Sequence, residues 1–286
     1  MARIKIVVDT SCDMPEELRA QYDIGRLSFL SIFGEDTYVT GVNLTNEQFY
    51  DMLEASERIP TTAQTPYQDM YDAFLEWSRD YDTVIFFAIS SKGSGQGHTA
   101  AMVAEDIAEE NPNADIRIVD SMAYSLLISA GAIYAAKLAA EGVSADEIVE
   151  KAAAEIGAWH ALLLVDTLKY LEKGGRINKT SAIIGTLLDI KPVLTVKNGL
   201  MEAEEKLRGK KKLLQKLVDL VEECEDFDAE NPRFMVVHSD QEKGEELCRL
   251  LCQKYGEGVV EIVSEFGPIV GTHVGRGAAA VIFRKK

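Results

Sequence analysis

Residues 82–120 read DTVIFFAISSKGSGQGHTAAMVAEDIAEENPNADIRIVD, and this stretch decides the fold of the first half of the chain. The apolar run at 83–89 predicts a buried strand, residues 98–110 predict a helix, and residues 116–120 predict another strand. Apolar strands that alternate with helices are typical of a parallel sheet covered on both faces. The glycine-rich loop at 93–97 should therefore lie at the carboxyl end of a strand, where such sheets bind ligands.

The segments before this stretch continue the alternation of strands and helices. A β-branched run at 3–9 predicts a strand, and a capping signature at Asp13 predicts a helix that ends near Tyr22. Two further strands should flank the turn at 34–36. Residues 122–141 predict a further helix, and Ser144 with Glu147 predicts the cap of another that ends near 157. The first half is thus expected to be a parallel, Rossmann-like α/β domain.

Two capping signals place a polar loop among these elements. Thr45 with Gln48 predicts a helix over 46–56, and Thr65 followed by Pro66 predicts the start of the next helix. The segment between these helices, RIPTTAQ at 58–64, is therefore expected to be an exposed loop rich in hydroxyl groups and an amide.

The second half has a different pattern. Asn198-Gly199 stands between two extended runs and predicts a β-hairpin, a signal that the first half lacks. Helices are expected at 209–225 and 241–255, with strands between and after them. This predicts a second α/β domain with a mixed sheet. The expected boundaries are 1–160 for the first domain and 161–286 for the second, with a ligand site between them.

Composition excludes several classes of partner. The chain has 286 residues with 30 Lys plus Arg and 47 Asp plus Glu, so its net charge is 30 − 47 = −17. Nucleic acids and anionic membrane surfaces both reward clustered cations, so neither is expected as a partner. No apolar run approaches the roughly 18 residues of a membrane span, so no stable membrane insertion is expected. The four cysteines show no C-x-x-C spacing, which favours a cytoplasmic protein with free thiols and no metal site.

The glycine loop favours an anion site. Gly93, Gly95 and Gly97 let the backbone approach a ligand closely, and the helix that follows adds unpaired N–H groups and partial positive charge. A dinucleotide fingerprint would need glycine where His98 stands, and a phosphate-binding P-loop would need a lysine before Thr99. Nucleotide binding therefore stays a minor alternative.

Nucleophilic catalysis is the second alternative. Ser94 lies in GSGQG rather than in G-x-S-x-G, and a serine nucleophile needs a partnered histidine. His273, in the glycine-rich segment GTHVG, is the best candidate for that partner. A serine-dependent acyl hydrolase that uses Ser94 and His273 therefore remains open. However, no acidic residue stands out as the third member of a catalytic triad, so this pair fits hydrogen bonding to an anion better.

Six segments together resemble the DegV family in order and spacing. They are VVDTSCDMP, PTTAQTP, ISSKGSGQGHTAA, VDSMAYSLLISAG, LKYLEKGGRI and GPIVGTHVGRG, and they run from Val7 to Gly277. The resemblance implies a two-domain α/β protein that binds a long-chain fatty acid, of the palmitate or oleate type, between its domains. It implies no cofactor besides that ligand and no chemistry by the chain itself. Such a protein presents the carboxylate to a separate ATP-dependent fatty acid kinase.

The resemblance also implies the site residues. The family's carboxylate ligands fall on Thr62 and Ser94, with the Gly95 N–H assisting, and on His273. Thr272 beside the histidine and Arg176 at the end of KGGR are secondary or entrance positions.

The chain departs from the family at three places near these residues. Ala63 stands where the family often has serine, Gln96-Gly97 where it usually has a threonine-tyrosine pair, and Arg276 where it usually has proline. These three departures affect what the resemblance implies about acyl-chain selectivity and about the choice of protein partner. A basic patch for docking a kinase is expected at 208–212 or at Arg176.

Overall fold

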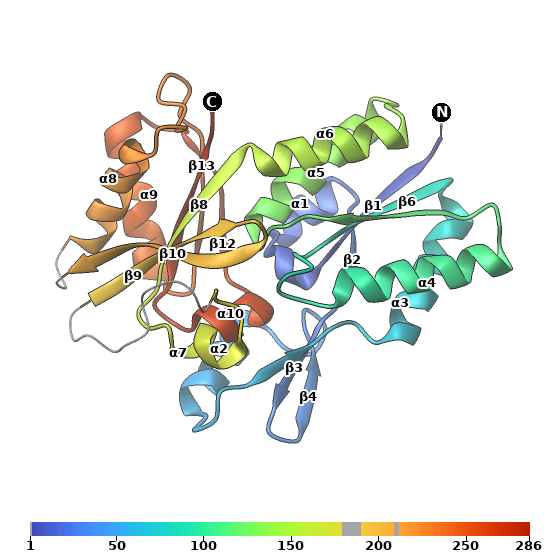
Figure 1. Cartoon of the computed structure of the whole chain (residues 1–286), viewed down its shortest axis with the longest axis horizontal. Helices are drawn as coiled ribbons and strands as arrows, with labels where there is room; N and C mark the ends of the chain where they lie inside the picture. Colours follow the sequence, from blue (N-terminus) through green and yellow to red (C-terminus); the bar gives the residue numbers. More distant parts are fainter. Residues whose placement is uncertain (1, 179–189, 209–211) are drawn as a thin grey trace. The chain divides into compact units, whose positions relative to one another are not determined.

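The computed structural model describes residues 2–178, 190–208 and 212–286. It divides into two units, Met1–Gly157 and Ala158–Lys286. Each unit has its own large sheet with helices, as Figure 1 shows. Both units are α/β, which confirms the predicted fold class.

The N-terminal unit is built on a four-stranded parallel sheet with the order β2-β1-β6-β7. Every residue of β6, the first strand of the stretch 82–120, is buried. This confirms the predicted parallel sheet. The strands are β1 (Ile4–Asp9), β2 (Gly25–Leu27), β6 (Thr83–Ala88) and β7 (Asp115–Asp120).

Helices pack on both faces of this sheet. Val84 and Phe86 of β6 join one apolar cluster with side chains of α3 and α4, which lie side by side (Figure 1). Side chains alternate along a strand, so Ile85 and Phe87 face the opposite side, where α5 contacts β1 and β6. The helices are η1 (Thr10–Cys12), α1 (Glu16–Gln21), α2 (Asn46–Ala55), α3 (Tyr67–Asp80), α4 (Gln96–Glu110), α5 (Leu126–Ala140) and α6 (Ala145–Gly157).

A small antiparallel sheet, β4-β3-β5, adjoins these elements in the same unit. Its strands are β3 (Leu30–Phe33), β4 (Asp36–Val39) and β5 (Thr61–Ala63). The expectation that 58–64 is all exposed loop was wrong, because Thr61–Ala63 pair with β3 and Thr62 lies opposite Ser31. A three-residue strand is too short to show the alternation that marks strands in a sequence.

Several helix starts differ from the prediction. Asp13 does not cap α1, whose N-cap is Pro15, and α5 begins at Leu126 rather than at 122. Two further differences lie near the glycine loop. Thr65 does not cap α3, whose N-cap is Pro66, because the Thr65 hydroxyl donates to the Ser28 carbonyl at 3.0 Å. The helix after the glycine loop begins at Gln96, two residues before the expected start at 98. By contrast, the predicted capping box at Thr45 is present in full.

The C-terminal unit has a six-stranded mixed sheet with the order β10-β9-β8-β13-β11-β12, in which only β11 and β12 pair in parallel. The predicted mixed sheet is confirmed. Asn198 and Gly199 form the predicted hairpin turn, with φ of 50° and 75°. The strands are β8 (Trp159–Leu164), β9 (Ile190–Lys197), β10 (Leu200–Arg208), β11 (Phe234–His238), β12 (Val260–Glu265) and β13 (Ala279–Arg284).

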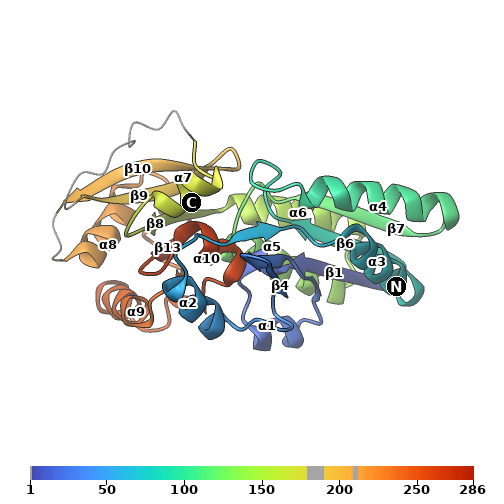
Figure 2. The same cartoon turned by 90° about the horizontal axis from the view of Figure 1, so that it is seen from below.

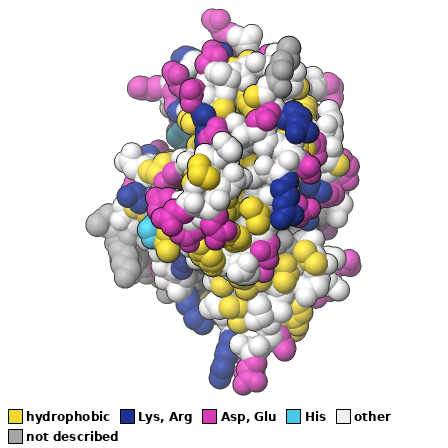
Figure 3. Space-filling model, turned by 90° about the vertical axis from the view of Figure 1, so that its right-hand side faces the viewer, with side chains coloured by type: hydrophobic (Ala, Val, Ile, Leu, Met, Phe, Trp, Pro, Cys, Tyr) yellow, Lys and Arg dark blue, Asp and Glu magenta, His cyan; other side chains and the backbone are white. Residues whose placement is uncertain are grey.

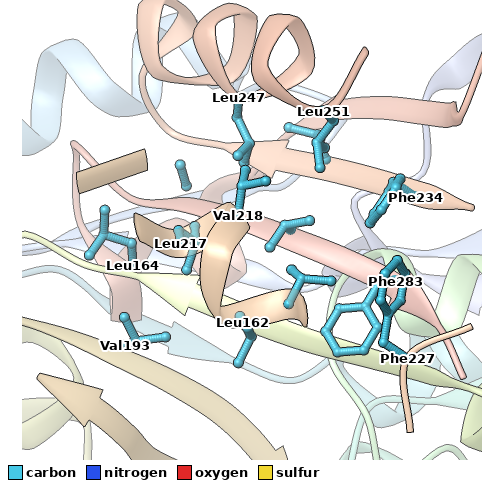
Figure 4. Packing of buried hydrophobic residues seen from close by; sticks show 14 of the residues in the cluster. Leu162, Leu164, Val193, Leu217, Val218, Phe227, Phe234, Leu247, Leu251 and Phe283 are labelled. Carbon is cyan, nitrogen blue, oxygen red and sulfur yellow. The ribbon is translucent and has the colours of Figure 1, made fainter. Parts of the chain in front are cut away.

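Helices α8 (Leu213–Glu223) and α9 (Gln241–Tyr255) supply one side of the core of this unit. Figure 4 shows Leu217 and Val218 of α8 close to Leu247 of α9, above the sheet residues Leu162 and Phe283. The remaining helices, α7 (Lys169–Gly174) and α10 (Pro268–Val274), pack against each other (Figure 2). The sequence analysis did not predict α10, whose seven residues carry the GTHV segment.

The surface agrees with the acidic composition. On the face drawn in Figure 3, acidic side chains lie among scattered Lys and Arg side chains. Within residues 2–178, 190–208 and 212–286, helices of sufficient length and apolarity to cross a membrane are absent.

Candidate functional site

The glycine loop turns the chain from the end of β6 into α4. The N–H groups of Gly93 and Ser94 both donate to the Ser90 carbonyl, at 2.9 and 3.1 Å. Gly95 is the N-cap of α4, and the Gln96 N–H donates to Ser94 Oγ at 3.2 Å. The first turn of this helix contains no acidic residue. The N-terminus of α4 therefore presents its positive end beside the Ser94 hydroxyl.

Side-chain amides join this loop to the strand that carries Thr62. Gln96 is fully buried, and its side chain accepts from the Thr65 N–H at 3.0 Å and donates to Thr65 Oγ1 at 2.9 Å. Gln64 donates to Thr99 Oγ1 of α4 at 2.6 Å. The segments that contain Thr62 and Ser94 thus lie against each other within the N-terminal unit.

The start of the loop packs against Tyr124, which follows β7. A Cβ on Gly93 would lie 2.6 Å from the Tyr124 hydroxyl and 2.8 Å from Cε1 of its ring. The Ser90 N–H also donates to the Ala123 carbonyl at 3.0 Å. Glycine at position 93 is therefore needed for the close approach of this aromatic ring.

A buried carboxylate, that of Asp9, holds the end of β6 through a hydrogen bond. Asp9 is fully buried, and it accepts from the Ser11 N–H and hydroxyl and from the Ile89 N–H at 3.2 Å. Burial raises the pKa of Asp9 to about 6, although these three hydrogen bonds oppose the shift. Its contact with Ile89 ties the end of β1 to the residue that follows β6, upstream of the glycine loop.

The C-terminal unit holds the predicted imidazole. His273 lies on α10, and its ring occupies the space that a Cβ on Gly174 of α7 would need. Burial, and to a lesser extent the Arg176 guanidinium, lower the pKa of His273 to about 4. The imidazole is therefore neutral at pH 7.

Two neighbours of His273 make local contacts. Thr272 is buried, and its hydroxyl donates to the Pro268 carbonyl at 2.8 Å. The hydroxyl proton of Thr272 is therefore engaged in a hydrogen bond within α10. The Arg176 guanidinium donates to the Gly174 carbonyl at the end of α7. This contact matches the role of an arginine that satisfies a helix-terminal carbonyl.

The predicted site residues thus form two groups. In the N-terminal unit the structure brings the segment of Thr62 against the loop of Ser94 and Gly95. In the C-terminal unit both His273 and Arg176 contact Gly174, and Thr272 precedes His273 on α10.

The positions that depart from the family pattern lie beside these groups. Ala63 pairs with Leu30 at the end of β5. Gly97 lies in the first turn of α4, where a Cβ would be 3.4 Å from the Ala88 side chain. Arg276 is exposed in the turn after α10.

The remaining predictions concern metal ligands, the cysteines and the basic patch. The described residues contain no group of three His, Cys, Asp or Glu placed to hold a metal ion. The four cysteines are free thiols. Of the predicted basic patch at 208–212, residues 209–211 lie outside the described residues.

Sequence reasoning missed the importance of Gln64, Gln96 and Tyr124. The signal was local, since Gln64, Gln96 and Tyr124 stand inside the second, third and fourth of the six segments that carry the family resemblance. Nothing in the spacing of these residues shows that they pair with Thr99, Thr65 and Gly93.

Comparisons with known proteins agree on one family. The model described as "Uncharacterised protein, DegV family" matches residues 3–286. Protein DegV of Bacillus subtilis is 32% identical over 282 residues, which cover 97% of this chain and 98% of that protein.

Two solved structures of this family closely resemble the fold. The crystal structure of DegV, a fatty acid binding protein from Bacillus subtilis, has a TM-score of 0.87 at 30% identity and full coverage of both chains. A fatty acid binding DegV family protein from Streptococcus agalactiae has a TM-score of 0.86 at 31% identity, again with full coverage of both chains. From the whole-length match and these likenesses, the chain belongs to the DegV family.

Proposed function

We propose that this protein binds a long-chain fatty acid and holds its carboxylate with Thr62, Ser94, the Gly95 N–H and His273. The observation that carries the proposal is the arrangement in the N-terminal unit. There, amide contacts join the Thr62 segment to the loop of Ser94, at the N-terminus of α4. Hydroxyl donors beside a helix N-terminus suit a carboxylate, which accepts charge-assisted hydrogen bonds.

The relatives support the same ligand class. Both solved structures described above are of proteins identified as fatty acid binding, and each is at least 30% identical to this chain over its full length. The neutral imidazole of His273 adds an N–H donor that carries no charge and needs no counterion.

Affinity and orientation have separate sources in this proposal. Burial of an acyl tail contributes about 0.8 kcal/mol per CH₂ group, so a long tail supplies most of the binding free energy. The head-group contacts then need only to orient the ligand and to select a carboxylate, which a few directional hydrogen bonds achieve.

One pKa and one hydrogen bond argue against the acyl hydrolase alternative. A general base should have a pKa near the working pH, and the pKa of His273 is about 4. In addition, Ser94 Oγ accepts from the N–H of Gln96, the residue that opens α4. These features suit a hydrogen-bonding serine better than a nucleophile.

We further propose that the protein acts in the cytoplasm as an accessory subunit without chemistry or cofactor of its own. In this role it presents the bound carboxylate to a separate ATP-dependent fatty acid kinase. The half-buried Arg176 and the exposed Arg276 are candidates for contact with that partner. Incubation of the loaded protein with a bacterial fatty acid kinase subunit and ATP should yield acyl-phosphate, whereas either protein alone should not.

The decisive experiment is mass spectrometry of the ligand carried by the protein after expression in bacteria. Denatured protein should release fatty acid in near-stoichiometric amount, and stripped protein should take up added palmitate or oleate. Protein that is ligand-free and also takes up neither fatty acid would contradict the proposal. The same spectra would report the chain length and unsaturation of the preferred ligand.

A further inference from the structure

Two glutamines connect the glycine loop to the Thr62 segment in opposite directions. Gln96, on α4, reaches Thr65 with both atoms of its amide, and Gln64, beside Thr62, reaches back to Thr99 on α4. We call these four residues, Gln64, Thr65, Gln96 and Thr99, the glutamine clasp. Its three hydrogen bonds are 2.6 to 3.0 Å long.

The side chain of Gln96 is committed to Thr65. A fully buried amide must satisfy its donors and acceptor inside the protein, so a polar side chain at this position is costly unless it is bonded. Here the acceptor and one donor both go to Thr65. An apolar residue of the same volume would leave the buried Thr65 N–H without this acceptor, so the amide of Gln96 fixes the backbone at Thr65 as well as filling space.

The strand that carries Thr62 is short and lies at the edge of its sheet. β5 has three residues and pairs with β3 among the described residues. Gln64 follows this strand directly, and a Cβ on Gly95 would lie 2.8 Å from Gln64 Oε1. The clasp therefore fixes how far the short strand stands from the backbone of Gly95.

The backbone of Gln96 also orients Ser94. Its N–H donates to Ser94 Oγ, so the oxygen is used as an acceptor on the protein side. The serine proton is then available for an acceptor on the ligand side. One residue thus orients the Ser94 hydroxyl through its backbone and holds the Thr62 segment through its side chain.

We propose that Gln96 and Gln64 are positioning residues that set the spacing between Thr62 and Ser94, so that both hydroxyls meet one carboxylate. This inference rests on the proposed fatty acid binding and adds a source for its head-group selectivity. Two hydroxyl donors can share one carboxylate only if both stand within hydrogen-bond reach of its oxygens, because hydrogen bonds weaken steeply when stretched or bent. The clasp should therefore select carboxylates over uncharged head groups and contribute little to tail binding.

The test compares oleic acid with oleyl alcohol, which has the same tail and an uncharged head. Dissociation constants are measured for the parent, Gln96→Ala, Gln64→Ala and the control Gln68→Ala, whose amide bonds Asp72 on the exposed side of α3. We expect Gln96→Ala and Gln64→Ala to weaken oleic acid binding about tenfold or more, as for the loss of one bond to a charged group. Oleyl alcohol binding should change less than about threefold, and Gln68→Ala should match the parent for both ligands.

Each other outcome has a definite meaning. If the clasp variants bind oleic acid as the parent does, or if they lose acid and alcohol affinity equally, the positioning role is wrong. If the parent itself binds neither ligand, the proposed function fails and this inference falls with it. Should Gln96→Ala not fold, Gln64→Ala and Thr99→Val break the second half of the clasp, where the side chains are only partly buried.

Discussion

The imidazole of His273 lies directly against Gly174, in the space that a side chain on residue 174 would need. α7 and α10 meet at this contact, and it sets where the imidazole points. Glycine at the end of α7 is therefore part of the candidate site, as well as the end of a helix.

Gly174→Ala should displace the His273 ring and weaken fatty acid binding about tenfold, the value of one bond to a carboxylate. The protein should still fold, because crowding by one methyl group typically costs about 1–3 kcal/mol. Gly157→Ala is the matched control, since a Cβ on Gly157 meets no atom within 4 Å. Isothermal titration calorimetry with palmitate measures the dissociation constant of both variants. Equal affinity of Gly174→Ala and the control would show that the position of His273 is irrelevant to the ligand.

Thr62→Ala and Ser94→Ala should each reduce the free energy of fatty acid binding by roughly 1.5–3 kcal/mol, because each removes a donor to a charged acceptor. Adjacent residues supply the controls. Thr61 is exposed and points to the opposite face of β5, and Ser91 is exposed before the loop. Thr61→Ala and Ser91→Ala should bind palmitate as the parent does. A double variant, Thr62→Ala with Ser94→Ala, that keeps full affinity would show that the carboxylate binds elsewhere.

The low pKa of His273 predicts a pH dependence of stability. The unfolded imidazole has its ordinary pKa of 6.5 and the folded one about 4, so between these values the unfolded chain binds more protons. Stability should therefore fall as the pH falls from about 6.5 to about 4, by roughly 3 kcal/mol in all from this one group. His273→Gln lacks this titration and should show a shallower acid slope in chemical denaturation. NMR of the imidazole, assigned through the same variant, should show no titration of His273 above pH 5 in the ligand-free protein.

The sequence predicted the architecture well and the contacts of the site poorly. The alternation of strands and helices over 82–120 depends on local hydrophobic periodicity, and it predicted the parallel sheet and the place of the glycine loop. The Asn198-Gly199 turn depends on backbone conformations that few residues adopt, so it was equally readable.

The failures have a common cause. Thr65 was expected to cap α3, but its hydroxyl donates to Ser28 and accepts from Gln96, 31 residues away in sequence. β5 forms because its backbone pairs with the edge of β3, and nothing within Thr61–Ala63 itself predicts a strand. Partners distant in sequence override local signals at the site, and a single sequence does not record which partners meet.

The packing of Tyr124 on the glycine loop gives a last prediction. Gly93→Ala places a methyl group where the hydroxyl and ring of Tyr124 now lie, so it should lower the free energy of unfolding by about 1–3 kcal/mol. Gly97→Ala, four residues on, meets only the Ala88 side chain at 3.4 Å and replaces a helical glycine. That variant should be neutral or stabilised by up to about 1 kcal/mol.

Chemical denaturation of Gly93→Ala, Tyr124→Ala and the double variant gives a double-mutant cycle. The losses in free energy of unfolding caused by the two single substitutions should be far from additive, because removal of the Tyr124 ring also removes the clash. Additive losses would mean that Gly93 is required for a reason other than its contact with Tyr124.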